Sequence, residues 1–179
     1  DTIYIEKGVY KEHELRIDKS ITIIGAKGSI IDGEQKGNVV LVTADSVHIS
    51  GIKIINVGSS FTQDFAAIRL HKANYCTVNN NEFDFVFFGI VVEKSKYVTV
   101  QNNLIQSNAK DEFNSGNGVH LWYCQHVLID KNQINNLRDG IYLEFVDSSI
   151  ISNNVSENNL RYGLHFMFSN QNEYSNNRF

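Results

Sequence analysis

A repeat of 22 or 23 residues limits what this chain of 179 residues can fold into. One column of small residues, each opening an apolar-x-apolar run, has five members: Ala67, Gly89, Gly118, Gly140 and Gly163. From each member to the first position of the next repeat is nine residues in all five cases. Such a period is too short for paired helices, and the alternation within it has the period of two that is typical of strands. Short strands repeating without hairpin turns predict a parallel β-solenoid.

A second column places an asparagine in each repeat, and its members are Asn81, Asn103, Asn132, Asn154 and Asn177. Because successive coils of a solenoid lie about 4.8 Å apart, these side chains should stack. Their amides are then expected to bond to one another and to the turn backbone. The chain also contains no proline, which agrees with interior strands that need every backbone N–H. A leucine-rich-repeat horseshoe is rejected because its leucine signature is missing.

We therefore predict an all-β fold, a right-handed parallel β-helix of about seven coils. Five side chains are expected to stack inside it: Ile68, Ile90, Val119, Ile141 and Leu164. Residues 1–179 are expected to form a single β-helix domain. The chain stops at Phe179, on a core position in mid-coil, and the last coil of a solenoid must be covered. We therefore expect further C-terminal coils in the parent protein.

Composition excludes several functional classes. The net charge is −4, which argues against a nucleic-acid binder that relies on a basic surface. No apolar run approaches the roughly 18–20 residues of a membrane span. Two cysteines cannot make a disulfide scaffold. Cys76 stands in a core column where other repeats have valine, so we expect it to be a small buried apolar residue.

Two columns of the glycine-led strands are expected to face outward, because the positions between them are apolar. The column two residues after the glycine comprises Arg69, Val91, His120, Tyr142 and His165, and the column four residues after it comprises His71, Glu93, Trp122, Glu144 and Met167. Aromatic and thioether side chains exposed together are typical of a contact surface. Two insertions, 57–66 and 107–117, leave the same corner and should border this face with Asp64, Asp111 and Glu112.

One hypothesis for this face is metal handling. The predicted ligands are His120, Glu144, His165 and Met167. Imidazole and thioether together favour copper, particularly Cu(I). The spacing is looser than in a Cys/His zinc site, so a transient site shared with a partner fits better than a buried structural one.

The same face is expected to contact a partner through Trp122, Tyr142, Cys124, Arg138 and Arg161. We expect Cys124 to be exposed because it lies near the end of its strand. Arg138 and Arg161 should stack as neighbours before their glycines, and like charges that close need solvent or an anion between them.

A competing hypothesis is carbohydrate binding or cleavage. Glu93 and Glu144 share a column two coils apart, roughly 9–10 Å, which is at or beyond the upper limit for the carboxylate pair of an inverting glycosidase. Trp122 lies between them and would suit stacking on a sugar, but it also occupies the place of the scissile bond. Since no workable acid–base pair or nucleophile arrangement occurs in the columns, we expect the protein not to be an enzyme. Carbohydrate binding stays open as the alternative function.

Three segments, 118–124, 138–145 and 161–170, resemble the NosD family of nitrous oxide reductase maturation proteins. The resemblance is specific for residues 115–179, whereas residues 1–114 match only the general β-helix pattern. It implies a periplasmic, non-enzymatic β-helix that acts with ABC transporter subunits and helps to assemble the copper site of nitrous oxide reductase. The implied partners are these subunits, a copper chaperone lipoprotein and the reductase itself, with copper as a transient cargo.

Overall fold

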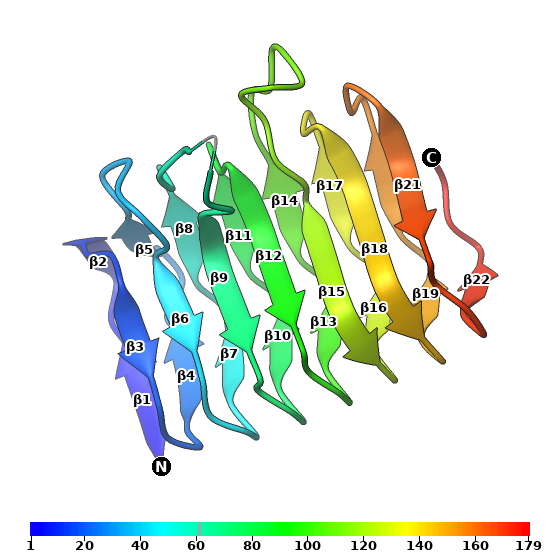
Figure 1. Ribbon diagram of the computed structural model, residues 1–179. Helices are drawn as coiled ribbons and strands as arrows, with labels where there is room; N and C mark the ends of the chain where they lie inside the picture. The colour runs from blue at the N-terminus through cyan, green and yellow to red at the C-terminus, as the bar shows by residue number, and fades with distance from the viewer. Residues whose placement is uncertain (61) are drawn as a thin grey trace.

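Three parallel sheets wind around one axis in this computed structural model, which describes residues 1–60 and 62–179. Each coil contributes one strand to every sheet in turn, and the sheets contain eight, seven and seven strands. The chain thus completes seven coils and begins an eighth, stacked from the N-terminal to the C-terminal end (Figure 1). The predicted all-β solenoid is confirmed.

The strands of the three sheets are as follows. The first sheet contains β1 (Thr2–Ile5), β4 (Thr22–Gly25), β7 (His48–Ser50), β10 (Thr77–Asn79), β13 (Thr99–Gln101), β16 (Leu128–Asp130), β19 (Ile150–Ser152) and β22 (Glu173–Ser175). The second contains β2 (Gly8–Lys11), β5 (Ser29–Asp32), β8 (Lys53–Ile55), β11 (Glu82–Asp84), β14 (Leu104–Gln106), β17 (Gln133–Asn135) and β20 (Val155–Glu157). The third contains β3 (Leu15–Ile17), β6 (Val40–Val42), β9 (Ala66–His71), β12 (Phe88–Glu93), β15 (Val119–Gln125), β18 (Asp139–Asp147) and β21 (Tyr162–Met167).

The core runs along the axis, and the five predicted residues stack within it in the third sheet. Their register is unbroken from Ile68 through Ile90, Val119 and Ile141 to Leu164. The first four are fully buried, whereas Leu164 is only partly buried. The difference arises because Leu164 belongs to β21, the edge strand of its sheet, and has a neighbouring strand on one side only.

The asparagine column forms the predicted ladder of amides. Each side chain donates to the Oδ1 of the asparagine in the next coil, with Nδ2–Oδ1 distances of 3.2 Å from Asn81 to Asn103 and 3.0 Å from Asn103 to Asn132. The same pattern continues to Asn154 and Asn177. Each Nδ2 also donates to a backbone carbonyl, as Asn81 does to Ile49. The ladder satisfies backbone groups at the bend that the sheets leave unpaired.

The glycine column lies at a second bend, where no side chain fits. A Cβ atom on Gly118 would lie 2.4 Å from Cγ2 of Ile134 and 2.6 Å from the carbonyl oxygen of Gly140. Gly118 therefore faces the core together with the following Val119, and strict alternation is broken there. As a result, the residue before each glycine lies on the outer face of the third sheet, as Phe88 does against the ring of His120.

The insertion between β14 and β15 projects beyond the outline of the coils (Figure 1). It leaves the register intact, since Ile90 still pairs with Val119. Glu112 borders the outer face, with its Oε2 4.0 Å from Nε of Arg161, whereas Asp111 bonds to Asn114 within the loop. In the insertion 57–66, residue 61 lies outside the described residues, and Asp64 borders the face through its carbonyl group.

A membrane-crossing helix, with the length and apolar character that this requires, is not found in the part of the chain that the structure describes.

Candidate functional site

The outer face of the third sheet, formed by β9, β12, β15, β18 and β21, carries the predicted site. Two in-register rows cross its C-terminal part. One contains His120, Tyr142 and His165, and the other contains Trp122, Glu144 and Met167. The structure therefore brings six of the predicted site residues onto one rigid face, although it does not leave all of them accessible.

His120 lies on the predicted face but is covered by aromatic neighbours. Its ring centroid is 5.6 Å from that of Phe88 and 4.8 Å from that of Tyr142, and neither ring nitrogen has a hydrogen-bond partner. Burial, together with the positive charges of Arg138 and Arg69, lowers the pKa of His120 to about 3. His120 faces outward as expected, but the rings of neighbouring coils leave it half-buried and cover both of its ring nitrogens.

We expect the half-buried His120, whose ring nitrogens are covered, to make folding stability depend on pH. Its pKa of about 3 in the folded protein lies below the unfolded value near ~6.5. Between these values the unfolded chain binds more protons, so stability falls as pH falls. From pH 7 to pH 5 the wild type should lose about 2 kcal/mol more than His120→Phe, which keeps a ring in place. Urea denaturation at both pH values measures this, and equal losses in the two proteins would contradict it.

Asp139 is the buried centre of a polar cluster that the alternation pattern of the sequence did not reveal. It is completely buried at the first position of β18. Its carboxylate lies 3.6 Å from Nε of Arg161, 3.9 Å from Nε of Arg138 and 3.6 Å from Nδ1 of His165. The two arginines, neighbours on adjacent coils as predicted, thus both approach one carboxylate, and Nδ1 of His165 lies beside the same group.

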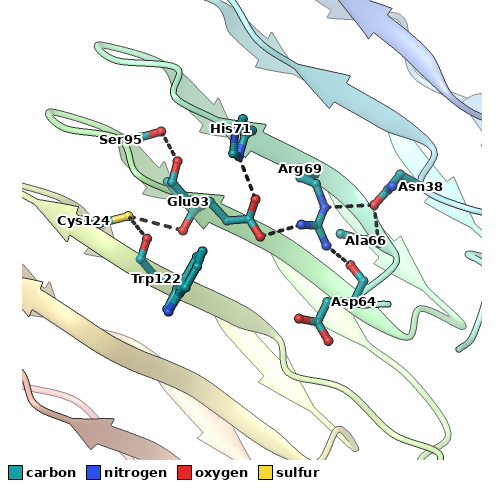
Figure 2. Close-up of polar contacts among 10 residues, drawn as sticks. Asn38, Asp64, Ala66, Arg69, His71, Glu93, Ser95, Trp122 and Cys124 are labelled. Carbon is teal, nitrogen blue, oxygen red and sulfur yellow. Dashed lines mark hydrogen bonds and ion pairs between the residues drawn. The ribbon is translucent and has the colours of Figure 1, made fainter. Parts of the chain in front are cut away.

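A second ionic cluster lies at the N-terminal end of the face (Figure 2). Glu93 accepts from Nη1 of Arg69 at 2.5 Å and contacts Nδ1 of His71 at 3.0 Å. Arg69 also donates to Oδ1 of Asn38 and to the carbonyl of Asp64. The carboxylate of Glu93 is therefore engaged by two basic side chains and is poorly placed to act as a free general acid.

The predicted metal ligands do not converge on one point. Within residues 1–60 and 62–179, no group of three or more His, Cys, Asp or Glu side chains is placed to hold a metal ion. Tyr142 separates His120 from His165 in their row, and its hydroxyl donates to Sδ of Met167 at 3.1 Å. Met167 itself is exposed.

The structure corrects the expectation that Cys124 is exposed and contacts a partner. It is completely buried, and its thiol donates to the carbonyl oxygens of Val92 and Trp122. Burial raises the pKa of this thiol to about 11, so it stays protonated and points into the core. The expectation for Cys76 is confirmed, since it is buried in the same core.

Strict alternation did not predict that Asp139 and Asn117, in the neighbouring coil, lie on the outer face. Each glycine faces the core together with the residue after it, so the inward and outward positions are exchanged for the residues before the glycine. A signal was nevertheless present. The residues immediately before the glycines read Ala66, Phe88, Asn117, Asp139 and Tyr162. Both Asn117 and Asp139 are fully buried, and neither side chain has a hydrogen-bond partner.

Comparison with known proteins supports the β-helix fold and shows to which family the chain belongs. Residues 37–179 match the family described as Right handed beta helix region, which confirms the predicted handedness. A probable ABC transporter binding protein NosD of Stutzerimonas stutzeri is 30% identical over 129 residues, 71% of this chain and 30% of that protein. The protein of the same name from Pseudomonas aeruginosa is 29% identical over 126 residues, 69% of this chain and 29% of its own length. The chain thus spans less than a third of these relatives.

Solved structures with the same architecture are more distant in sequence. The surface adhesin PfbA of Streptococcus pneumoniae has a TM-score of 0.61 at 13% identity, covering 85% of this chain and 53% of that one. A putative glycosyl hydrolase of Parabacteroides merdae has a TM-score of 0.58 at 12% identity, covering 87% and 79%. At such identities the likeness shows the fold alone.

Proposed function

Because this chain belongs to the right-handed β-helix family and is NosD-like within it, we propose that it is a binding component of an ABC transporter system that helps to assemble a copper site. In this proposal it acts in the periplasm, together with transporter subunits and a copper chaperone lipoprotein, and nitrous oxide reductase receives the copper. The observation that carries the proposal is the match to two relatives that are both named as probable ABC transporter binding proteins.

The outer face of the third sheet supports this role physically. Trp122, Tyr142 and Met167 come from three successive strands whose register is fixed by the sheet, so a partner would meet a preformed surface. Lys94 adds a positive charge, with its Nζ 4.9 Å from the centroid of the Trp122 ring. Aromatic and methionine side chains are enriched where proteins contact partners.

Copper would be a cargo at this face. Because both ring nitrogens of His120 are covered, the copper ion would be contacted by His165, Glu144 and Met167. Nδ1 of His165 faces Asp139, which directs Nε2 away from the carboxylate. Since these side chains do not form a closed ligand set, the ion would need further ligands from a partner, and such a site releases copper readily.

We expect His165→Ala and Met167→Ala each to reduce copper delivery several-fold. The assay uses cells that depend on this protein to mature nitrous oxide reductase, and the copper content of the purified reductase is measured. Isolated wild-type protein should bind Cu(I) weakly, and less at pH 5 than at pH 7, because protonated imidazole cannot ligate a metal.

Gln133→Ala is a suitable control, since this exposed residue of β17 lies on another sheet and should leave delivery unchanged. Melting temperatures of the two site variants should stay close to wild type, because Met167 is exposed and His165 faces outward. A double variant that folds and delivers copper normally would contradict the proposal for this face.

We propose that the protein is not an enzyme, because the outward-facing positions of its glycine-led strands offer no workable acid–base pair. Glu93 is paired with Arg69 and His71, and Trp122 stands in register between Glu93 and Glu144. Incubation with polysaccharides should therefore release no product. Turnover that is lost in Glu144→Gln would instead support the alternative of a carbohydrate-cleaving β-helix.

A further inference from the structure

Buried side-chain polar atoms that lack a hydrogen-bond partner are concentrated at one place in the described part of this molecule. Among the described residues, all such side-chain atoms except Oδ1 of Asn79 belong to Asn117, His120, Arg138, Asp139 and His165. A buried polar group without a partner costs free energy, and a native protein normally satisfies it. They gather on one part of the outer face, where Arg138 and His165 approach the Asp139 carboxylate at 3.9 and 3.6 Å without a hydrogen bond.

Two guanidinium groups stand side by side at this place. Arg138 and Arg161 occupy adjacent coils, where the backbone N–H of Arg161 donates to the carbonyl of Arg138 at 2.9 Å. Both approach the Asp139 carboxylate through Nε, at 3.9 and 3.6 Å. In the described part of the chain, no acceptor bonds to the Nη atoms of either guanidinium.

The arginine side chains are partly open to solvent, while the carboxylate that orients them is not. Side-chain exposure is 29% for Arg138 and 31% for Arg161, against 0% for Asp139. The ring of Tyr162 supports the second guanidinium, with its centroid 5.2 Å from Cζ of Arg161. The two guanidinium groups are thus held near each other, and the N–H donors of their Nη atoms are available to a ligand.

We propose that Arg138 and Arg161 bind a small oxyanion, the carboxylate or phosphate group of a ligand, with Asp139 as the residue that positions them. The planar fork of a guanidinium matches two oxygen atoms of such a group. Two arginines and the Asp139 carboxylate leave one positive charge, and a ligand would replace the exposed Glu112, whose Oε2 lies 4.0 Å from Nε of Arg161. This site goes beyond the proposed role in copper delivery and does not depend on it.

The same charges argue against a metal ion at Asp139. A cation bound to this carboxylate and to His165 would lie close to two guanidinium groups that already contact the carboxylate within 4 Å. Repulsion between like charges in a partly buried site is strong. An anion is instead attracted to the two guanidinium groups and reduces the repulsion between them.

The test is a calorimetric titration of the protein with inorganic phosphate and, separately, with sodium acetate, at constant ionic strength set with chloride. We expect saturable binding to one site, weakened at least tenfold in Arg138→Gln and in Arg161→Gln. Arg16→Gln, which changes an exposed arginine of β3, is the matched control and should bind as wild type. Tighter binding of phosphate than of acetate would assign the ligand group as a phosphate, and the reverse order as a carboxylate.

Asp139→Asn separates positioning from simple charge attraction. This variant raises the net positive charge, so attraction alone predicts tighter binding, whereas loss of positioning predicts weaker binding, which we expect. Circular dichroism and the melting temperature establish that each variant is folded. Absence of saturable binding to the wild type, or unchanged binding in both arginine variants, would overturn the proposal, and tighter binding by folded Asp139→Asn would overturn the role of Asp139.

Discussion

Replacing Asn132 with alanine is expected to destabilise the protein by about 3 kcal/mol. Its Oδ1 accepts from both the backbone N–H and Nδ2 of Asn103, and its Nδ2 donates to Val100 and Asn154, all at 3.0 Å. Alanine removes these four contacts and leaves the N–H of Asn103 and the carbonyl of Val100 buried without this partner. Each buried group left unpaired costs about 1–3 kcal/mol. Urea denaturation at neutral pH measures the loss.

The control for this ladder variant is Asn108→Ala, at an exposed asparagine of the insertion between β14 and β15. A surface substitution of this kind changes stability by roughly 0.5 kcal/mol or less. If Asn132→Ala unfolds at the same urea concentration as Asn108→Ala, the ladder does not contribute as its geometry indicates.

A methyl group at Gly118 should be similarly costly, by about 3 kcal/mol, which lowers the melting temperature by roughly 6–12 °C in a chain of this size. The new Cβ would lie 2.4 Å from Cγ2 of Ile134 and 2.6 Å from the carbonyl oxygen of Gly140. That oxygen belongs to the next coil, so it can move only if the coil shifts. The small entropic benefit of alanine in the unfolded chain is outweighed. Thermal unfolding followed by circular dichroism measures the effect.

Gly8→Ala provides the contrast, because a Cβ there would meet only the Tyr10 ring at 3.6 Å, an ordinary contact distance. Its melting temperature should stay within a few degrees of wild type. Equal losses at Gly8 and Gly118 would mean that close packing between the coils is not what requires glycine in this column.

The fold could be predicted from the sequence because a solenoid repeats its constraints. The nine-residue spacing from the glycine column fixes the register, and the stacked Asn81 to Asn177 amides have one geometry that suits every coil. Core positions such as Ile90 and Val119 follow from the same alternation. Leu164, which lacks a neighbouring coil on one side, also packs against the core as predicted and is only less deeply buried.

The site was less predictable, because exposure there depends on neighbours from other coils. Sequence parity placed His120 on the correct face, but whether its ring is covered depends on Phe88 and Tyr142. Asp139 was missed because the bend at glycine reverses the alternation. Cys124 was misplaced because the alternation of β15 breaks at Tyr123, which is exposed and has a positive φ of 53°, so that the thiol of the next residue faces inward.

The unbroken register of the third sheet also sets a scale of length along the molecule. Equivalent outward side chains recur once per coil, about 4.8 Å apart, and insertions such as 107–117 do not alter that interval because Ile90 and Val119 remain paired. A binding partner that contacts several coils must therefore present its own groups at multiples of this interval. The interval between coils thus restricts which partners can bind across several coils, whichever side chains the surface carries.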